Sequence, residues 1–337
     1  MTDVSFRAVE ICAGAGGQAL GLSQAGFGHS ALVEIDKHAC ATLRHNASRG
    51  KWKASTVHEA DVRAWIEEVR RGVHDLGEVT LLAGGVPCPP FSIAGKQLGS
   101  DDDRDLFPAM LELASLVEPR AVMIENVRGL MSTKFQAYRD EISAELEAMG
   151  YVPQWQVLEA HHYGVPQLRP RTIMIALRAN DAAHWSWPKP KPSSTRTVGQ
   201  TLFKSMASKG WEGAAAWAAT ANAIAPTLVG GSKKHGGADL GPTRAKRQWA
   251  GLGVDGLGVA NEVPGPGSAG SPKLTVQQAA MIQGFPATWE IQGRKTAAYR
   301  QVGNAFPPPV AKAVGLQIRA ALEAADSAAA GLEDLAV

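Results

Sequence analysis

The sequence has few of the features that mark membrane, secreted or metal-binding proteins. It contains no run of about 18 apolar residues, the length needed to cross a bilayer, and its first residues lack the basic and then apolar pattern of a secretory signal. Only three cysteines occur, with no CxxC pair, which argues against a disulfide framework and a zinc site. We therefore expect a cytoplasmic protein with reduced thiols and no metal.

The net charge of the chain is small because opposite charges are segregated along it. The formal total is +2, yet residues 178–250 carry 11 Lys and Arg against 3 Asp and Glu, a local +8 that leaves −6 for the rest. Clustered basic side chains attract polyanions, since each contact with a phosphate releases a condensed counterion. Nucleic acid is the partner that this distribution favours.

The first half of the chain alternates short β-branched or apolar runs with helical patterns. This alternation predicts an α/β fold built on a doubly wound, mostly parallel sheet. Apolar residues at helical spacing within 106–114 and 135–149 are assigned to the core. The predicted strands are Arg7–Ala13, Ser30–Glu34, Val79–Ala83, Ala121–Glu125 and Thr172–Leu177.

Changes in composition divide the chain into four parts. Residues 1–184 contain the predicted sheet. Residues 185–271 are irregular and end, from residue 251, in a stretch with seven glycines and two prolines that we expect to be a flexible connection. Helical spacing returns in residues 272–325, which we expect to rejoin the first part, and the alanine-rich tail, residues 326–337, is expected to fray.

A glycine-rich turn, Ala13-Gly14-Ala15-Gly16-Gly17, follows the first predicted strand. It occupies the place where a doubly wound sheet presents its ligand crevice. Glu34 ends the next strand, where an acid accepts hydrogen bonds from ribose hydroxyls, so a nucleoside-containing cofactor is indicated. NAD, FAD and S-adenosylmethionine all use such loops, but the incomplete G-x-G-x-x-G disfavours the dinucleotides. Asp61 either meets an adenine amino group or caps the following helix.

Cys88 lies in a different setting from the other two cysteines. It follows a predicted strand, within Gly84-Gly85-Val86-Pro87-Cys88-Pro89-Pro90-Phe91-Ser92, a proline-stiffened loop at the carboxyl end of the sheet. A lone cysteine is more often a small buried apolar residue, an assignment that we keep for Cys12 and Cys40. The rigid flanks and the crevice favour a reactive thiol at Cys88.

An acid and two arginines are predicted at the same edge of the sheet. Glu125-Asn126-Val127 closes another strand, where burial would let Glu125 hold a proton near neutral pH. Gln167-Leu168-Arg169-Pro170-Arg171 sets two guanidinium groups at alternate positions of an extended segment, so both can point to one face. Without the neighbouring features, a pair of surface arginines would be the preferred interpretation.

The order of these blocks resembles that of the DNA cytosine-5 methyltransferases of bacterial restriction-modification systems. The similarity runs from Phe6 to Ile318, interrupted by the basic segment. It implies the Rossmann-like fold of S-adenosylmethionine-dependent methyltransferases, with residues 1–184 catalytic and 185–271 a smaller target-recognition domain. The most specific blocks are Pro87-Cys88 with Phe91-Ser92, Glu125-Asn126-Val127, Gln167-x-Arg169-x-Arg171, Leu274-Thr275 through Gln283-Gly284-Phe285-Pro286, and Gln301-Val302-Gly303-Asn304.

The resemblance implies covalent catalysis on a cytosine rotated out of duplex DNA. Cys88 would add to carbon 6 of the ring, so that carbon 5 can attack the methyl group of S-adenosylmethionine and leave S-adenosylhomocysteine. Glu125 would hydrogen-bond ring N3 and Arg171 the exocyclic oxygen, while Asn126 orients the loop and Arg169 is structural. No residue is assigned as the base that removes the carbon 5 proton.

The resemblance also assigns ligand-binding residues. The loop from Ile93 to Asp105 resembles the family's closing loop, and Thr227–His235 resembles part of the recognition region. The residues expected to bind DNA are Ser92, Lys96, Arg104, Lys233 and Lys234. The residues expected to bind the cofactor are Ala13, Gly14, Gly16, Gly17, Glu34, Ile35, Asp61, Val62, Pro87 and Asn304.

The sequence departs from the family pattern at four positions. Cys12 stands where a phenylalanine usually stacks on the cofactor's adenine, so Ile11 or Ile35 is expected to cover that ring. The other departures do not touch the catalytic set: Pro89 replaces a common glutamine, and Pro272 and Gln277 replace arginines.

Three alternative functions stay open on the sequence alone: a transfer RNA cytosine-5 methyltransferase, an inert DNA-binding module on this fold, and a nicotinamide-dependent oxidoreductase. The separate basic segment favours duplex DNA over RNA, and the complete set of Cys88, Glu125 and Arg171 argues against an inert module. From the resemblance we expect a monomer acting on bacterial nucleoid DNA, with a cognate restriction endonuclease as a further partner.

Overall fold

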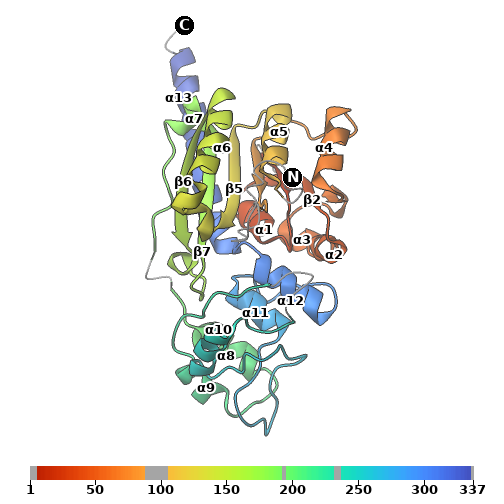
Figure 1. Cartoon of the computed structure of the whole chain (residues 1–337), viewed down its shortest axis with the longest axis vertical. Coiled ribbons are helices and arrows are strands. Elements are labelled where there is room, and N and C mark those ends of the chain that lie inside the picture. The colour runs from red at the N-terminus through yellow and green to blue at the C-terminus, as the bar shows by residue number, and fades with distance from the viewer. Residues whose placement is uncertain (1–5, 88–104, 192–194, 231–236, 335–337) are drawn as a thin grey trace.

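A seven-stranded sheet forms the centre of the upper lobe in Figure 1. The structure, a computed structural model, describes residues 6–87, 105–191, 195–230 and 237–334. The strand order is β3-β2-β1-β4-β5-β7-β6, with parallel pairing from β3 through β5 and antiparallel pairing of β7 with both neighbours. The strands are β1 (Arg7–Ile11), β2 (Gly28–Glu34), β3 (Val57–Glu59), β4 (Leu81–Gly84), β5 (Ala121–Val127), β6 (Tyr151–Glu159) and β7 (Pro170–Arg178).

The predicted mostly parallel α/β sheet is confirmed, and each of the five predicted strands overlaps an observed one. Two strands are not in the prediction. β3 has only three residues, and β6 lies at the sheet edge and contains Pro153, which weakens its strand pattern. β7 runs antiparallel because the short 3-10 turn η4 (Ala160–Tyr163) and the few residues after it cannot make the crossover that parallel strands need.

Helices cover both faces of the sheet, as a doubly wound fold requires. On one face Trp65, Met110 and Ile142 pack from α4, α5 and α6 onto β-strand residues, and on the other Leu22 and Val314 pack from α1 and α13. The helices of this lobe are α1 (Gly17–Gln24), α2 (Lys37–His45), α3 (Ala47–Gly50), α4 (Val62–Arg70), α5 (Phe107–Val117), α6 (Gln136–Ala148), α7 (Ala179–Ala182) and α13 (Pro308–Asp334).

The lower lobe in Figure 1 contains short helices joined by irregular segments. Its core includes Trp217, Leu228 and Trp249 and continues through Trp289 to Leu43 of the sheet domain, so the two lobes share one hydrophobic cluster. The helices are α8 (Val198–Ala207), α9 (Ala214–Thr220) and α10 (Thr243–Gly251), followed at the lobe boundary by α11 (Val276–Ile282) and α12 (Lys295–Asn304).

Two stretches are more ordered than their composition predicts. In the glycine-rich stretch, Val254 and Val259 are buried and Ala260 forms a bridge with Thr275, although the part from 261 to 271 is mostly exposed. The tail expected to fray from residue 326 instead continues α13 to Asp334. Alanine has the highest helix propensity, and the first turns of α13 are anchored in the core, so the helix propagates into solvent.

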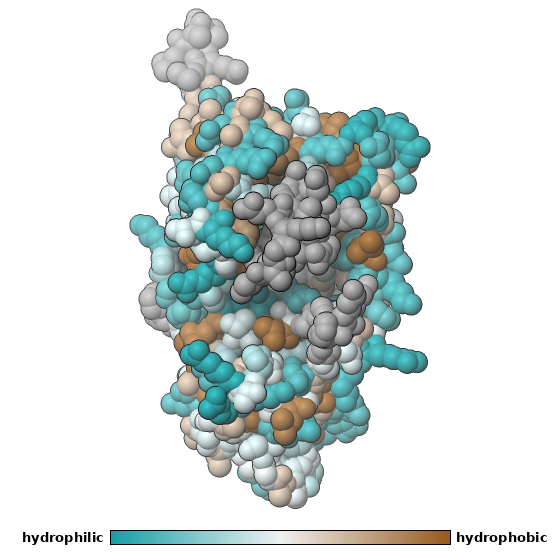
Figure 2. Space-filling view, viewed as in Figure 1, coloured by the Kyte–Doolittle hydropathy of each residue, from teal (hydrophilic) through white to brown (hydrophobic). Residues whose placement is uncertain are grey.

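Within the described residues, no helix combines the length and apolar character that a membrane span requires. The same residues contain no cluster of three or more His, Cys, Asp or Glu side chains able to bind a metal ion. Figure 2 shows hydrophilic side chains over much of one face of both lobes, with hydrophobic ones scattered among them.

Candidate functional site

Two adjoining cavities lie where the carboxyl ends of the central strands face α12. The first has a volume of about 260 Å³ and the second about 500 Å³. Gly85, just after β4, and Asn304, the last residue of α12, line both. A ligand in the first cavity would therefore be next to a ligand in the second.

The glycine turn between β1 and α1 forms one wall of the first cavity. Cys12, Gly14 and Gly16 all have positive φ, at 53°, 54° and 80°, a conformation that a non-glycine residue such as Cys12 adopts at some cost. A side chain at Gly17 would place its Cβ 2.1 Å from the Phe306 carbonyl oxygen. The turn can therefore pack directly against the segment after α12.

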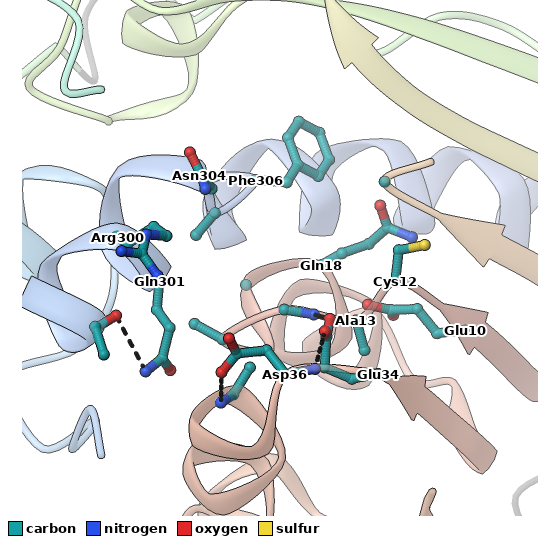
Figure 3. A pocket seen from close by; sticks show the side chains of 17 residues that line it. Glu10, Cys12, Ala13, Gln18, Glu34, Asp36, Arg300, Gln301, Asn304 and Phe306 are labelled. Carbon is teal, nitrogen blue, oxygen red and sulfur yellow. Dashed lines mark hydrogen bonds between the residues drawn. The ribbon is translucent and has the colours of Figure 1, made fainter. Parts of the chain in front are cut away.

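Glu34 holds the glycine turn from the end of β2. Its Oε2 accepts a hydrogen bond from Gly14 N at 2.8 Å, and its Oε1 accepts one from Asp36 N at 2.8 Å. Figure 3 shows Glu34 and Asp36 on one side of the cavity and Arg300 and Asn304 on the side that faces them. The carboxylate thus orders the wall and also lines the first cavity.

Gln18, at the start of α1, has buried polar atoms that lack a partner. The residue is 4% exposed and lines the first cavity, yet neither its amide nitrogen nor its amide oxygen has a hydrogen-bond partner among the described residues. Buried side-chain polar groups in folded proteins are nearly always hydrogen-bonded. The cavity therefore has an unmatched donor and acceptor that a polar ligand would satisfy.

The second cavity contains an acid and a guanidinium in direct contact. Arg171 Nε lies 2.7 Å from Glu125 Oε1, and both side chains are 12% exposed. In the register of β5 and β7, Arg171 faces Val127, so Glu125 is its diagonal neighbour on the same face of the sheet. Burial raises the pKa of Glu125, and the charges of Arg171 and Arg169 only partly oppose this.

Backbone contacts fix the loop that enters the second cavity after β4. Asn126 donates from Nδ2 to the carbonyl of Val86 at 2.9 Å, and Gly85 allows Glu125 to approach, since a Cβ there would lie 3.2 Å from Glu125 Oε2. Pro87 lines the cavity and accepts a hydrogen bond from Leu106 N. The segment just before Cys88 is therefore held beside the acid.

Arg169 connects three distant parts of the chain. It is fully buried, and its guanidinium donates to the carbonyl oxygens of Leu228 at 2.7 Å, Gly303 at 2.8 Å and Ala305 at 3.1 Å. Leu228 and Gly303 line the second cavity, and Gly303 is the next-to-last residue of α12. Arg169 is fully buried and Arg171 is only 12% exposed, so the alternative interpretation of the two as a pair of surface arginines is wrong.

Comparisons with known proteins identify the family that shares this arrangement. A model of the C-5 cytosine-specific DNA methylase family matches residues 6–320. The chain belongs to this family. The methylase is 57% identical over 321 residues to the type II methyltransferase M.NaeI of Lentzea aerocolonigenes, covering 94% of this chain and 76% of the relative. It is 48% identical to M.NgoMIV of Neisseria gonorrhoeae, with 95% and 99% covered.

A solved structure agrees on the fold of the methylase. The crystal structure of a Spodoptera frugiperda DNMT2 mutant superposes with a TM-score of 0.62 at 16% identity, over 94% of this chain and 100% of that one. The predicted fold, family and restriction-modification type are confirmed, and the protein is a DNA cytosine-5 methyltransferase. The interpretations as an oxidoreductase or an inert module are no longer needed, and the transfer RNA alternative is disfavoured.

The structure gathers part of the predicted cofactor set of the methylase. The first cavity is lined by Ala13, Gly14, Gly17, Glu34 and Asn304, and the second by Pro87. The other four predicted residues line neither cavity: Gly16 caps α1, Ile35 is 65% exposed, Val62 is buried in the core, and Asp61 is the N-cap of α4.

Several predicted residues of the methylase lie outside the described residues. They are Cys88, the DNA-binding candidates Ser92, Lys96 and Arg104, and Lys233 and Lys234. Conversely, the first cavity includes residues that the sequence did not single out as ligands, Gln18, Asp36, Arg300 and Phe306. Gln18 is a polar residue among the small and apolar residues that begin α1, which is a signal that the sequence offered.

Replacing Glu34 with alanine should weaken S-adenosylhomocysteine binding by about 10- to 100-fold, because a ribose partner and the anchor of Gly14 N are lost together. Isothermal titration calorimetry measures this effect. Glu59→Ala is the matched control, since Glu59 ends the neighbouring strand β3 but lines neither cavity. Equal affinities in the two variants would remove Glu34 from cofactor binding.

Proposed function

We propose that the protein transfers a methyl group from S-adenosylmethionine to carbon 5 of a cytosine rotated out of a specific duplex DNA sequence. The observation that carries this proposal is the shared boundary of the two cavities. One has the glycine turn and acid of a nucleoside site, the other has the acid and guanidinium suited to a pyrimidine, and Gly85 and Asn304 line both. Methyl donor and acceptor would therefore meet without either leaving its site.

The residues of the first cavity fit S-adenosylmethionine, which supplies an electrophilic methyl group when bound. Glu34 would accept hydrogen bonds from the ribose hydroxyls, and the unpartnered amide of Gln18 matches the polar amino-acid end of the molecule. Ile35, exposed beside the cavity, would cover the adenine in place of the usual phenylalanine. C5 methyltransferases as a family use this cofactor, which supports the assignment.

The residues of the second cavity have separate roles in the proposed reaction. The Cys88 thiolate would form a bond to carbon 6, and the electron pair displaced onto the ring makes carbon 5 nucleophilic. Protonated Glu125 would donate a hydrogen bond to N3, and Arg171 would donate to the exocyclic oxygen. Carbon 5 would then bond to the methyl carbon as the bond from that carbon to the cofactor sulfur breaks, and S-adenosylhomocysteine would leave. Loss of the carbon 5 proton to a base would restore the ring double bond and expel the Cys88 thiolate. Asn126 and Arg169 position the loop and the cavity wall.

Residues 185–271, with their basic character, would form the target-recognition domain and 272–325 would return the chain to the catalytic domain. We further propose action as a monomer on nucleoid DNA in a bacterial cytoplasm, beside a cognate restriction endonuclease. The type II methyltransferase names of its relatives support this setting. Lys233 and Lys234 would contact phosphates or guanines.

Methylation of unmodified bacterial genomic DNA with labelled S-adenosylmethionine, followed by bisulfite sequencing, tests the proposed function. We expect 5-methylcytosine in one recurring short context, with no label in a matched RNA substrate. A M.NaeI-type methyltransferase preparation serves as the positive control. Label in transfer RNA, or no label beside a working control, would contradict the proposal.

DNA binding should weaken steeply with salt. If the recognition domain neutralises several phosphates, log Kd changes with log salt concentration by about 0.9 per phosphate, so Lys233→Gln with Lys234→Gln should lower the slope by about two. Fluorescence anisotropy over a salt series measures it. The control pair is Lys51→Gln with Lys53→Gln, exposed lysines outside residues 178–250. A slope equal in both pairs would exclude the two lysines from phosphate contact.

A further inference from the structure

Three exposed aliphatic side chains lie in or beside the lining of the second cavity. Val127, Leu168 and Val229 are 42%, 44% and 43% exposed, whereas most aliphatic residues of the sheet domain are buried. Val127 and Val229 line the cavity itself. Leu168 is joined to its wall, because Thr227, another lining residue, donates a hydrogen bond from Oγ1 to the Leu168 carbonyl.

Hydrogen bonds fix the two segments that carry Leu168 and Val229. Leu168 N donates to the Ala225 carbonyl at 2.8 Å, and Leu228 N donates to Gln167 Oε1 at 2.8 Å. In these paired extended segments Gln167 and Leu228 are fully buried, so the residues next to each of them point the other way. The exposure of Leu168 and Val229 is therefore set by the same contacts that build the cavity.

Nothing in the described part of the chain covers these side chains, and they border the opening through which a base would enter. A base that leaves the duplex loses its stacking contacts and leaves a gap in the helix. DNA-bending and base-displacing proteins fill such gaps with leucine, isoleucine, methionine or phenylalanine side chains. Charged or polar residues would contact phosphates or base edges instead and would not replace stacking.

We propose that Leu168 and Val229 form an apolar rim that packs against the DNA bases next to the rotated cytosine and so stabilises the open duplex. The proposal rests on the proposed function, because it requires a base in the second cavity. Duplex DNA is the occupant that fits: its stacked bases are apolar on their faces, and it is the substrate of this enzyme family. Val127, on β5, also lines the cavity and would contact the base itself.

A duplex with 2-aminopurine at the target position reports on the rim, because the fluorescence of this base rises when it unstacks. The duplex carries the sequence context found by bisulfite sequencing. The test variant combines Leu168→Ser with Val229→Ser, and the matched control combines Leu257→Ser with Val152→Ser, which removes one exposed leucine and one exposed valine that line neither cavity. A third variant, Leu168→Met with Val229→Ile, keeps the apolar character.

We expect the serine pair at the rim to lower the equilibrium for unstacking by about tenfold, while the control pair and the conservative pair behave like the wild type. S-adenosylhomocysteine affinity and the salt dependence of DNA binding should not change, since neither residue is charged or lines the first cavity. A rim variant indistinguishable from the control pair would overturn the proposal. A wild-type protein that neither methylates DNA nor unstacks the probe would instead contradict the proposed function.

Discussion

Replacing Cys88 with serine should lower kcat by about 10⁴-fold or more and leave S-adenosylhomocysteine affinity within about twofold of the wild type. Carbon 5 of cytosine is a weak nucleophile until a second nucleophile has added to carbon 6. A thiolate forms at a pH where a serine hydroxyl stays protonated, so the serine variant loses the adduct on which the later steps depend. The first cavity, which binds the cofactor in our proposal, does not include the loop residue Pro87 next to Cys88.

The adduct itself gives a readout that does not depend on turnover. With duplex DNA that carries 5-fluorocytosine at the target, carbon 5 has no proton to lose, so the wild-type enzyme should stay covalently attached and appear as a higher-mass species. Cys88→Ser should form no such species, whereas Cys40→Ala, which removes a buried thiol from α2, should still form it. Turnover by Cys88→Ser near the wild-type rate would refute the covalent mechanism.

The local sequence predicted the parts of the site that depend on the ends of parallel strands. The glycine turn follows β1, Glu34 ends β2 and Glu125 lies two residues before the end of β5, and parallel strands bring their carboxyl ends to one edge of the sheet. Strand order was not needed for this result, because every ligand crevice of a doubly wound sheet lies at that edge. The contact between Glu125 and Arg171 was harder to predict from the sequence, since it depends on the antiparallel register of β5 and β7.

Contacts between residues far apart in the chain determine the parts of the site that local sequence patterns do not predict. Arg169 and Arg171 have the same residue type at alternate positions, yet the partners of Arg169 lie 59, 134 and 136 residues away along the chain, at Leu228, Gly303 and Ala305. No local pattern encodes a site formed by three separate segments. Asp61 is the opposite case: its hydrogen bonds to the next helix, from Arg63 N and Ala64 N, are local, and the N-cap alternative followed from the sequence.

Replacing Glu125 should give the second large change in activity. The direction of the pH dependence that Glu125 causes follows from the burial of its carboxyl group. Removal from water raises the pKa of Glu125, with Arg171 and Arg169 only partly opposing the shift. A raised pKa keeps the carboxyl protonated to higher pH, which the hydrogen bond to ring N3 requires. Activity that depends on this proton is therefore full below the raised pKa and is lost as pH rises through it, so kcat/KM should fall on the alkaline side.

Glu125→Gln separates hydrogen-bond donation to ring N3 from transfer of the Glu125 proton. The amide still donates a hydrogen bond to N3 at every pH but cannot transfer a proton, so kcat should fall by about 10²- to 10³-fold while the alkaline decline due to Glu125 disappears. Steady-state methylation rates measured from about pH 5 to 10 give both the fall in kcat and the presence or absence of the alkaline decline. Glu34→Gln is the control, because a change in the first cavity should raise the cofactor KM and keep the alkaline decline. An unchanged decline in Glu125→Gln would assign that titration to another group and leave Glu125 as an electrostatic partner of Arg171 only.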